Sequence, residues 1–102
     1  MLELRPGCEC CDKDLPPDSA EARICTFECT FCATCADEVL KGRCPNCGGE
    51  LVRRPIRPMN EYRPGEGLRL NPAGIVRRHA KYSPDEVAAL VVRLRDIPAD
   101  QR

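Results

Sequence analysis

The sequence has little of what an ordinary hydrophobic core needs. Its 102 residues contain no tryptophan and only four aromatic residues, namely Phe27, Phe31, Tyr62 and Tyr82. Ten prolines further limit regular secondary structure. A chain of this length buries only about two-thirds of its unfolded surface, so apolar burial alone would give marginal stability. No apolar run is long enough to cross a membrane. Another source of stability is therefore expected, and bound metal is one that small domains use.

Histidine is nearly absent as well, which bears on catalysis. A catalytic zinc ion keeps an open coordination position and usually has a histidine or carboxylate ligand. The single histidine, His79, follows the last cysteine by 32 residues (79 − 47 = 32) and is expected to be an exposed residue of the tail. We therefore expect no catalysis of the chain's own.

What the chain does have is nine cysteines in a regular spacing. Eight of them read C-x2-C-x13-C-x3-C-x2-C-x2-C-x8-C-x2-C, and C-x2-C steps place two sulfurs on one ion from a tight turn. Cys10 is adjacent to Cys11 and is the candidate for a spare thiol. Eight ligands predict two Zn²⁺ ions per chain. The pairs of cysteines could be combined into sites either sequentially or in an interleaved cross-brace. One treble-clef or ribbon site around Cys44 and Cys47 is the alternative.

A disulfide scaffold is the competing interpretation of so many cysteines. The cysteine count is odd, and the opening MLELRPGCECC has neither the apolar stretch nor the cleavage site of a secretory signal. Reduced thiols in the cytoplasm are therefore expected. The charge is uneven: residues 1–50 carry ten acidic and five basic side chains, and residues 51–102 carry six and eleven. We expect either that the two halves attract each other or that the basic half binds nucleic acid.

Local patterns predict a small, metal-dominated α+β fold with one short helix and a small β-hairpin. Strands are expected at residues 22–27 and 50–53, and a helix of about two turns at 35–42, closed by a left-handed Gly42. Gly48 is expected to take a positive φ in the last C-x2-C turn. A double-zinc domain is thus predicted for residues 1–53, a Pro/Arg-rich linker for 54–70 and a helical extension for 71–97.

The helical extension has two predicted parts. A short helix from Asn71 through about Lys81 is the first. The second runs from Pro84 to Ile97, because Ser83 and Glu86 form a capping box and Pro98 ends the run. One face of this second helix is apolar, and it is expected either to fold back onto the zinc domain or to bind a partner or a second copy. That face consists of Val87, Leu90, Val91 and Leu94.

The order and spacing of the cysteines resemble a RING-type domain over residues 8–47. The segment CTFCATC at residues 29–35 is similar to the RING H-x-F-C-x-x-C pattern, with Cys29 in place of histidine, and CPNC at 44–47 is similar to its C-P-x-C. The resemblance implies an interleaved cross-brace of two four-cysteine sites. The first would be Cys8, Cys11, Cys32 and Cys35. The second would be Cys25, Cys29, Cys44 and Cys47.

A closer resemblance covers residues 1 to about 57. ECTFC, CPNCGGELVRRP and the opening LRPGCECC resemble a family of small bacterial proteins of unknown function. This resemblance implies a bacterial cytoplasmic protein and supplies no activity.

These observations favour a structural zinc module that mediates protein-protein interaction. A ubiquitin-type ligase module is one alternative, against which stand Cys10 before the second ligand and Gly48 after the last one, where RING ligases often have an apolar residue and a cation. A nucleic-acid-binding regulator is the other, and it would use the basic tail, although aromatic residues for base stacking are scarce. Its candidate phosphate contacts are Arg53, Arg54, Arg57, Arg77 and Arg78.

Overall fold

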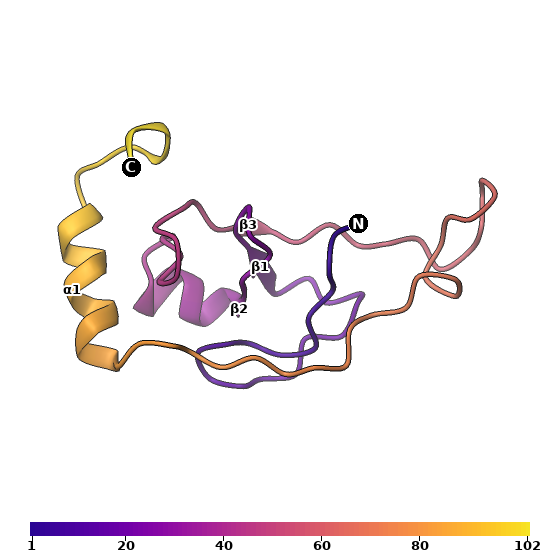
Figure 1. Cartoon of the computed structure of the whole chain (residues 1–102), viewed down its shortest axis with the longest axis horizontal. Coiled ribbons are helices and arrows are strands. Elements are labelled where there is room, and N and C mark those ends of the chain that lie inside the picture. Colours follow the sequence, from indigo (N-terminus) through magenta and orange to yellow (C-terminus); the bar gives the residue numbers. More distant parts are fainter.

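The computed structural model describes all 102 residues as a small three-stranded sheet with helical segments at one side (Figure 1). The strands are β1 (Ala22–Ile24), β2 (Thr30–Cys32) and β3 (Val52–Arg53), in the order β2-β1-β3. Both pairings are antiparallel, with Arg23 opposite Phe31 and opposite Arg53. The predicted α+β class and the hairpin are confirmed, although the strands are shorter than expected. The helical segments are η1 (Cys35–Val39), α1 (Pro84–Leu94) and η2 (Ala99–Gln101).

Cysteine side chains, rather than aromatic ones, make up most of the core. The main buried cluster has 11 residues, of which six are cysteines, and Phe31 is its one aromatic member. An apolar core this poor in large side chains needs a further source of stability. The full cluster is Cys8, Leu15, Ala22, Cys25, Cys29, Phe31, Cys32, Cys35, Leu40, Cys44 and Val87.

The helix predicted after Cys35 is present as a single wide turn. Segment η1 is a π-helix, and the Leu40 and Gly42 amides bond to the Cys35 and Ala36 carbonyls at 2.8 Å. Gly42 has a φ of +80°, which is the left-handed ending expected from the sequence. Leu40 is fully buried beneath this turn. The wide turn therefore directs Ala36 and Leu40 inward while holding Cys35 at its start.

The helix predicted for residues 71–81 is wrong, because this segment is extended. Residues 72–82, here called the tail segment, run back along the N-terminus (Figure 1). The Gly74 amide donates to the Leu4 carbonyl at 2.9 Å, and the Arg77 guanidinium reaches the Asp12 and Asp14 carboxylates at 2.8 Å. Backbone and side-chain partners outside the segment thus replace the hydrogen bonds of a helix.

The second predicted helix forms as α1 and begins with the expected capping box. The Glu86 amide donates to the Ser83 hydroxyl, the Ser83 amide donates to the Glu86 carboxylate, and Pro84 occupies the first turn. The helix ends at Leu94, three residues before the predicted Ile97.

Of the two fates expected for the apolar face of α1, the structure shows folding back. Val87 and Leu94 are buried, Leu90 is half-buried, and Val91 packs against the main core cluster. At the C-terminal end of α1, Arg43 donates to the Leu94 and Arg95 carbonyls. These carbonyls have no partner within the helix, so Arg43 satisfies them. The four residues proposed as a partner surface are thus largely engaged within the chain.

We expect loss of the Ser83 cap to weaken α1 without disturbing the sheet. Ser83→Ala should cost about 1 kcal/mol of helix stability, because the Glu86 amide loses its acceptor. Hydrogen exchange of the amides in α1 should quicken by about fivefold. Ser83→Asn is the matched control, because it restores an N-cap oxygen and should keep exchange near the native rate.

Candidate metal centres

The first cysteine cluster joins the turn at Cys8 and Cys11, which precedes β1, to the end of β2 and the start of η1. The Sγ atoms of Cys8, Cys11, Cys32 and Cys35 all lie within 4.8 Å of one another. Cys11 and Cys32 have their sulfurs 3.7 Å apart. A disulfide would need about 2.05 Å, whereas ligands about 2.3 Å from a tetrahedral ion lie about 3.8 Å apart. The cluster has the dimensions of a four-thiolate metal site.

The second cluster gathers the other C-x2-C turn. The Sγ atoms of Cys25, Cys44 and Cys47 lie within 4.8 Å of one another. The predicted fourth member, Cys29, is buried in the same core cluster, but its sulfur lies outside that distance. The two clusters take cysteines alternately along the chain, so the cross-brace arrangement is the one the structure shows. Cys10 belongs to neither cluster and is exposed.

Backbone amides surround the sulfurs in the manner of metal-binding turns. The Cys11 and Cys35 amides donate to the sulfurs of Cys8 and Cys32, each at 3.4 Å. Three similar bonds serve the second cluster, at 3.3 to 3.4 Å. Their donors and acceptors are Phe27 to Cys25, Asn46 to Cys44 and Gly49 to Cys47. Such bonds stabilise the thiolate form that binds metal.

Local backbone conformation makes these turns possible. The expected positive φ of Gly48 is present at +76°, and it lets the chain turn sharply after Cys47. Glu28 has a φ of +68° in the turn between β1 and β2. The predicted strand at residues 22–27 ends at Ile24 because this turn starts at Cys25.

Burial by itself works against the thiolate form of these cysteines. Desolvation raises the pKa of Cys35 and of Cys44, and the neighbouring cysteines add to the effect. A bound cation reverses this balance, because it binds the deprotonated sulfur directly. The donor set therefore fits a thiophilic divalent ion, with four sulfurs in the first cluster and three, with Cys29 adjacent, in the second.

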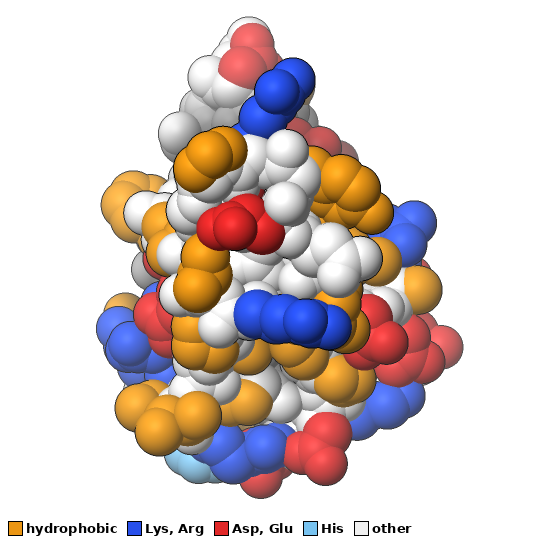
Figure 2. Space-filling view, turned by 90° about the vertical axis from the view of Figure 1, so that its right-hand side faces the viewer, with side chains coloured by type: hydrophobic (Ala, Val, Ile, Leu, Met, Phe, Trp, Pro, Cys, Tyr) orange, Lys and Arg blue, Asp and Glu red, His pale blue; other side chains and the backbone are white.

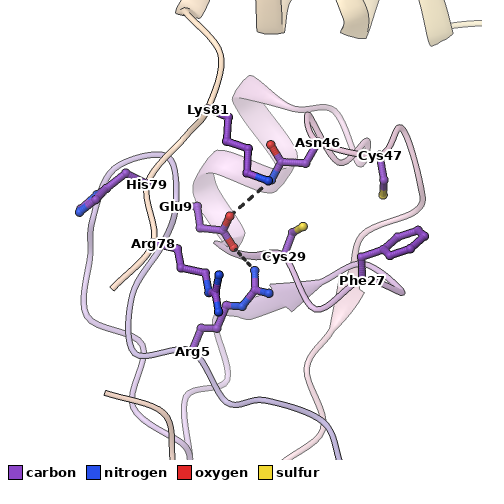
Figure 3. Close-up of a pocket in the computed structure, with 9 residues that line it drawn as sticks. All are labelled: Arg5, Glu9, Phe27, Cys29, Asn46, Cys47, Arg78, His79 and Lys81. Carbon is purple, nitrogen blue, oxygen red and sulfur yellow. Dashed lines mark hydrogen bonds and ion pairs between the residues drawn. The ribbon is translucent and has the colours of Figure 1, made fainter. Parts of the chain in front are cut away.

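A buried carboxylate, which sequence reasoning missed, connects the two clusters (Figure 3). Glu9 lies between Cys8 and Cys10, accepts from the Thr30 amide at 2.6 Å and bonds to Arg5 at 3.0 Å. It also accepts from the Asn46 amide group at 3.4 Å. Glu9 thus connects the turn at Cys8 and Cys11 to β2 and to the turn at Cys44 and Cys47. The signal in the sequence that could have indicated this role is an acidic residue between Cys8 and Cys11, two cysteines with metal-binding spacing.

The Arg5 side chain is the charge partner of Glu9. Burial disfavours the charged guanidinium, but the bond and the charge of Glu9 outweigh it, so the pKa of Arg5 lies above its usual value. The side chains of both residues are nearly inaccessible. Arg43, which caps α1, is a second residue that spacing arguments did not find.

The arginines predicted to contact phosphate have diverse environments. Arg53 is exposed on β3, and Arg78 lies 3.5 Å from the Glu3 carboxylate. Arg57 donates to the Leu2 and Asn71 carbonyls, and Arg77 binds the two aspartates named above. The contacts of Arg77 and Arg78 with carboxylates follow the attraction expected between the acidic and basic halves.

Arg54 differs from the other four, because only 1% of its surface is exposed. It donates to the carbonyls of Arg5, Leu15 and Pro16 at 2.8, 3.2 and 2.9 Å. Burial lowers the pKa of its guanidinium. A side chain so enclosed serves the fold, and the prediction that it contacts phosphate does not fit this position.

The chain's helices are all too short or too polar to span a bilayer. No solved structure matches the chain significantly. The chain is 64% identical over 77 residues to R02474, an uncharacterized protein of Rhizobium meliloti (strain 1021), which covers 72% of this chain and 92% of the relative. A family model described as a protein of unknown function (DUF1272) matches residues 1–57, which include both clusters. The chain therefore belongs to the DUF1272 family, as the cysteine-rich signature in its first half predicted.

Proposed function

We propose that this chain is a structural zinc module that binds two Zn²⁺ ions in the cytoplasm and presents its surface to a protein partner. The observation that carries the proposal is the first cluster, in which four sulfurs meet with the spacing of a tetrahedral site and receive backbone N–H bonds. Four thiolates close the coordination shell and leave no position for a reacting water. The ion would accordingly stabilise the fold and supply no catalysis.

Zinc is proposed over other ions on the chemistry of the donors. Thiolate sulfur favours zinc, copper(I) and iron–sulfur clusters, and tetrahedral four-cysteine sites are typical of structural zinc. The interleaved pairing supports a fold determined by its ions. Each cluster links segments far apart in the chain, so that both ions are needed to hold residues 8–47 in one shape.

The surface proposed for a partner is the loop of residues 58–71, here called the projecting loop. It extends from the molecule at the end opposite α1 (Figure 1). Its base is fixed, because the Leu68 amide donates to the Pro58 carbonyl at 2.7 Å and the Asn71 side chain donates to two loop carbonyls. Met59, Tyr62 and Leu70 nevertheless remain more than half exposed. Figure 2, which looks onto this end, shows apolar side chains interspersed with charged ones. Aromatic residues and methionine, here Tyr62 and Met59, are enriched in protein interfaces.

Two measurements test this proposal. Mass spectrometry under native conditions should find two zinc ions per chain, and one ion would contradict the cross-brace. Affinity capture with the zinc-loaded chain should then retain a partner that is lost when Met59, Tyr62 and Leu70 are all changed to serine. Val39→Ser and Val52→Ser, exposed apolar positions elsewhere, are the matched controls and should retain it.

A further inference from the structure

The two clusters differ in how completely they are assembled. All four sulfurs of the first cluster lie within 4.8 Å of one another, and three of its residues are buried. In the second cluster only three sulfurs meet this distance, and the adjacent Cys29 has its sulfur outside it. Each cluster has one exposed cysteine, Cys11 in the first and Cys47 in the second. The first cluster therefore presents four gathered sulfurs, whereas the second presents three and needs the Cys29 sulfur to come closer.

Cavities flank the last C-x2-C turn on two sides. One of about 430 Å³ is lined by Cys29, Cys47 and Phe27 together with residues of the tail segment, as Figure 3 shows. Another of about 580 Å³ lies between the Pro45–Gly48 stretch and α1. Both reach Cys47. Water and small chelators thus reach the second cluster at Cys47 through two cavities. The first cluster is exposed at Cys11 and buried at Cys8, Cys32 and Cys35.

The same turn is the surface on which the C-terminal helix rests. Leu94 packs so closely on Gly48 that a Cβ there would lie 3.1 Å from the leucine methyl group. Arg43 donates to the Leu94 carbonyl at 3.2 Å, and Arg102 donates to the Gly48 carbonyl at 3.0 Å. Residues 43–49, here called the last knuckle, therefore hold two sulfurs of the second cluster and most polar contacts of the α1 end.

We propose that the second cluster is an exchangeable zinc site whose rate of exchange is set by the docking of α1, while the first cluster retains its ion. This proposal rests on the proposed function, since it requires two bound ions. Because the ion and α1 share the last knuckle, the coupling is reciprocal: docking slows loss of the ion, and loss of the ion releases α1. Release exposes the apolar face of the helix.

Chelator competition on the zinc-loaded full chain tests the inequality of the sites. With excess colorimetric chelator, zinc should leave in two phases of equal amplitude, one ion in each. Cys47→Ser should abolish the fast phase and leave one slowly released ion. A single phase carrying both ions would overturn the proposal and leave the proposed function intact, whereas fewer than two ions at the start would contradict the proposed function itself.

Variants of α1 test the control of exchange. Leu94→Ala should speed the fast phase on the order of tenfold and leave the slow phase unchanged, because it removes packing from Gly48, beside the second cluster. Val92→Ala is the matched control, since Val92 is 60% exposed on the same helix, and it should change neither phase. Arg102→Ala, a milder change, should speed the fast phase by a few-fold.

The effect of ion loss on the docking of α1 is measured by proteolysis of the helix. When a chelator has removed one ion, as counted by native mass spectrometry, trypsin should cleave at Arg93 and Arg95 at least severalfold faster than in the two-ion form. Equal cleavage of both forms, or a fast phase indifferent to Leu94→Ala, would show that α1 does not control the second site.

Discussion

Cys8→Ala should unfold the cysteine-rich half of the chain, while Cys10→Ala, two residues away, should leave it folded. Cys8 is fully buried and belongs to the first cluster, whereas Cys10 is exposed and belongs to neither. A structural zinc site contributes on the order of 10 kcal/mol, which is as large as the whole stability of a typical small domain. Loss of one of four ligands therefore removes more free energy than the remaining core supplies.

Zinc content and dispersion of the amide NMR signals measure this pair of variants. Cys8→Ala should lose at least one ion and collapse the dispersion of residues 1–53, and Cys10→Ala should retain two ions and the native spectrum. If Cys10→Ala also lost an ion, Cys10 would be a ligand and the assignment of the spare thiol would be wrong.

Arg54→Ala should be the most destabilising substitution outside the cysteines. The Arg54 guanidinium donates to three backbone carbonyls, and a buried acceptor that loses its donor costs about 1 to 3 kcal/mol. Truncation also leaves a cavity where one of the largest fully buried side chains stood. The free energy of unfolding of the zinc-loaded chain should fall by about 3 kcal/mol or more, as measured by chemical denaturation.

Arg53→Ala is the matched control, because the neighbouring side chain is exposed on β3 and an exposed substitution typically changes stability by less than about 0.5 kcal/mol. Arg54→Met restores volume but no donors, and it should recover only the packing part of the loss. Equal effects of Arg53→Ala and Arg54→Ala would mean that the three carbonyl contacts contribute nothing.

The cysteine spacing was sufficient to predict the metal-binding frame, because chelation imposes a strict local rule. Two residues between cysteines set both the turn and the amide bonds to sulfur, so that Cys44–Cys47 and the turn at Gly48 followed directly from the sequence. The alternation of the clusters was anticipated through the RING resemblance. The capping box at Ser83 is similarly local, and the start of α1 was correct to the residue.

Contacts between distant segments could not be predicted in the same way. The tail segment is extended because Asp12, Asp14 and the Leu4 carbonyl lie where Arg77 and Gly74 reach them, and no local pattern encodes that meeting. Arg54 looked like one more basic residue of a linker, although three carbonyls enclose it. The role of Glu9 likewise depends on its partners Arg5 and Thr30, which only the fold brings to it.

The interleaving of the clusters has a consequence for how the chain is made. A ribosome delivers the chain from its N-terminus, so the last sulfur of the first cluster, Cys35, is synthesised twelve residues before Cys47, the last of the second (47 − 35 = 12). The first ion can be captured while the second cluster still lacks Cys44 and Cys47. The helix that rests on the last knuckle follows some 40 residues later (84 − 44 = 40). Loading during translation is thus expected to be ordered, with the tightly closed site filled first and the site beneath α1 completed last.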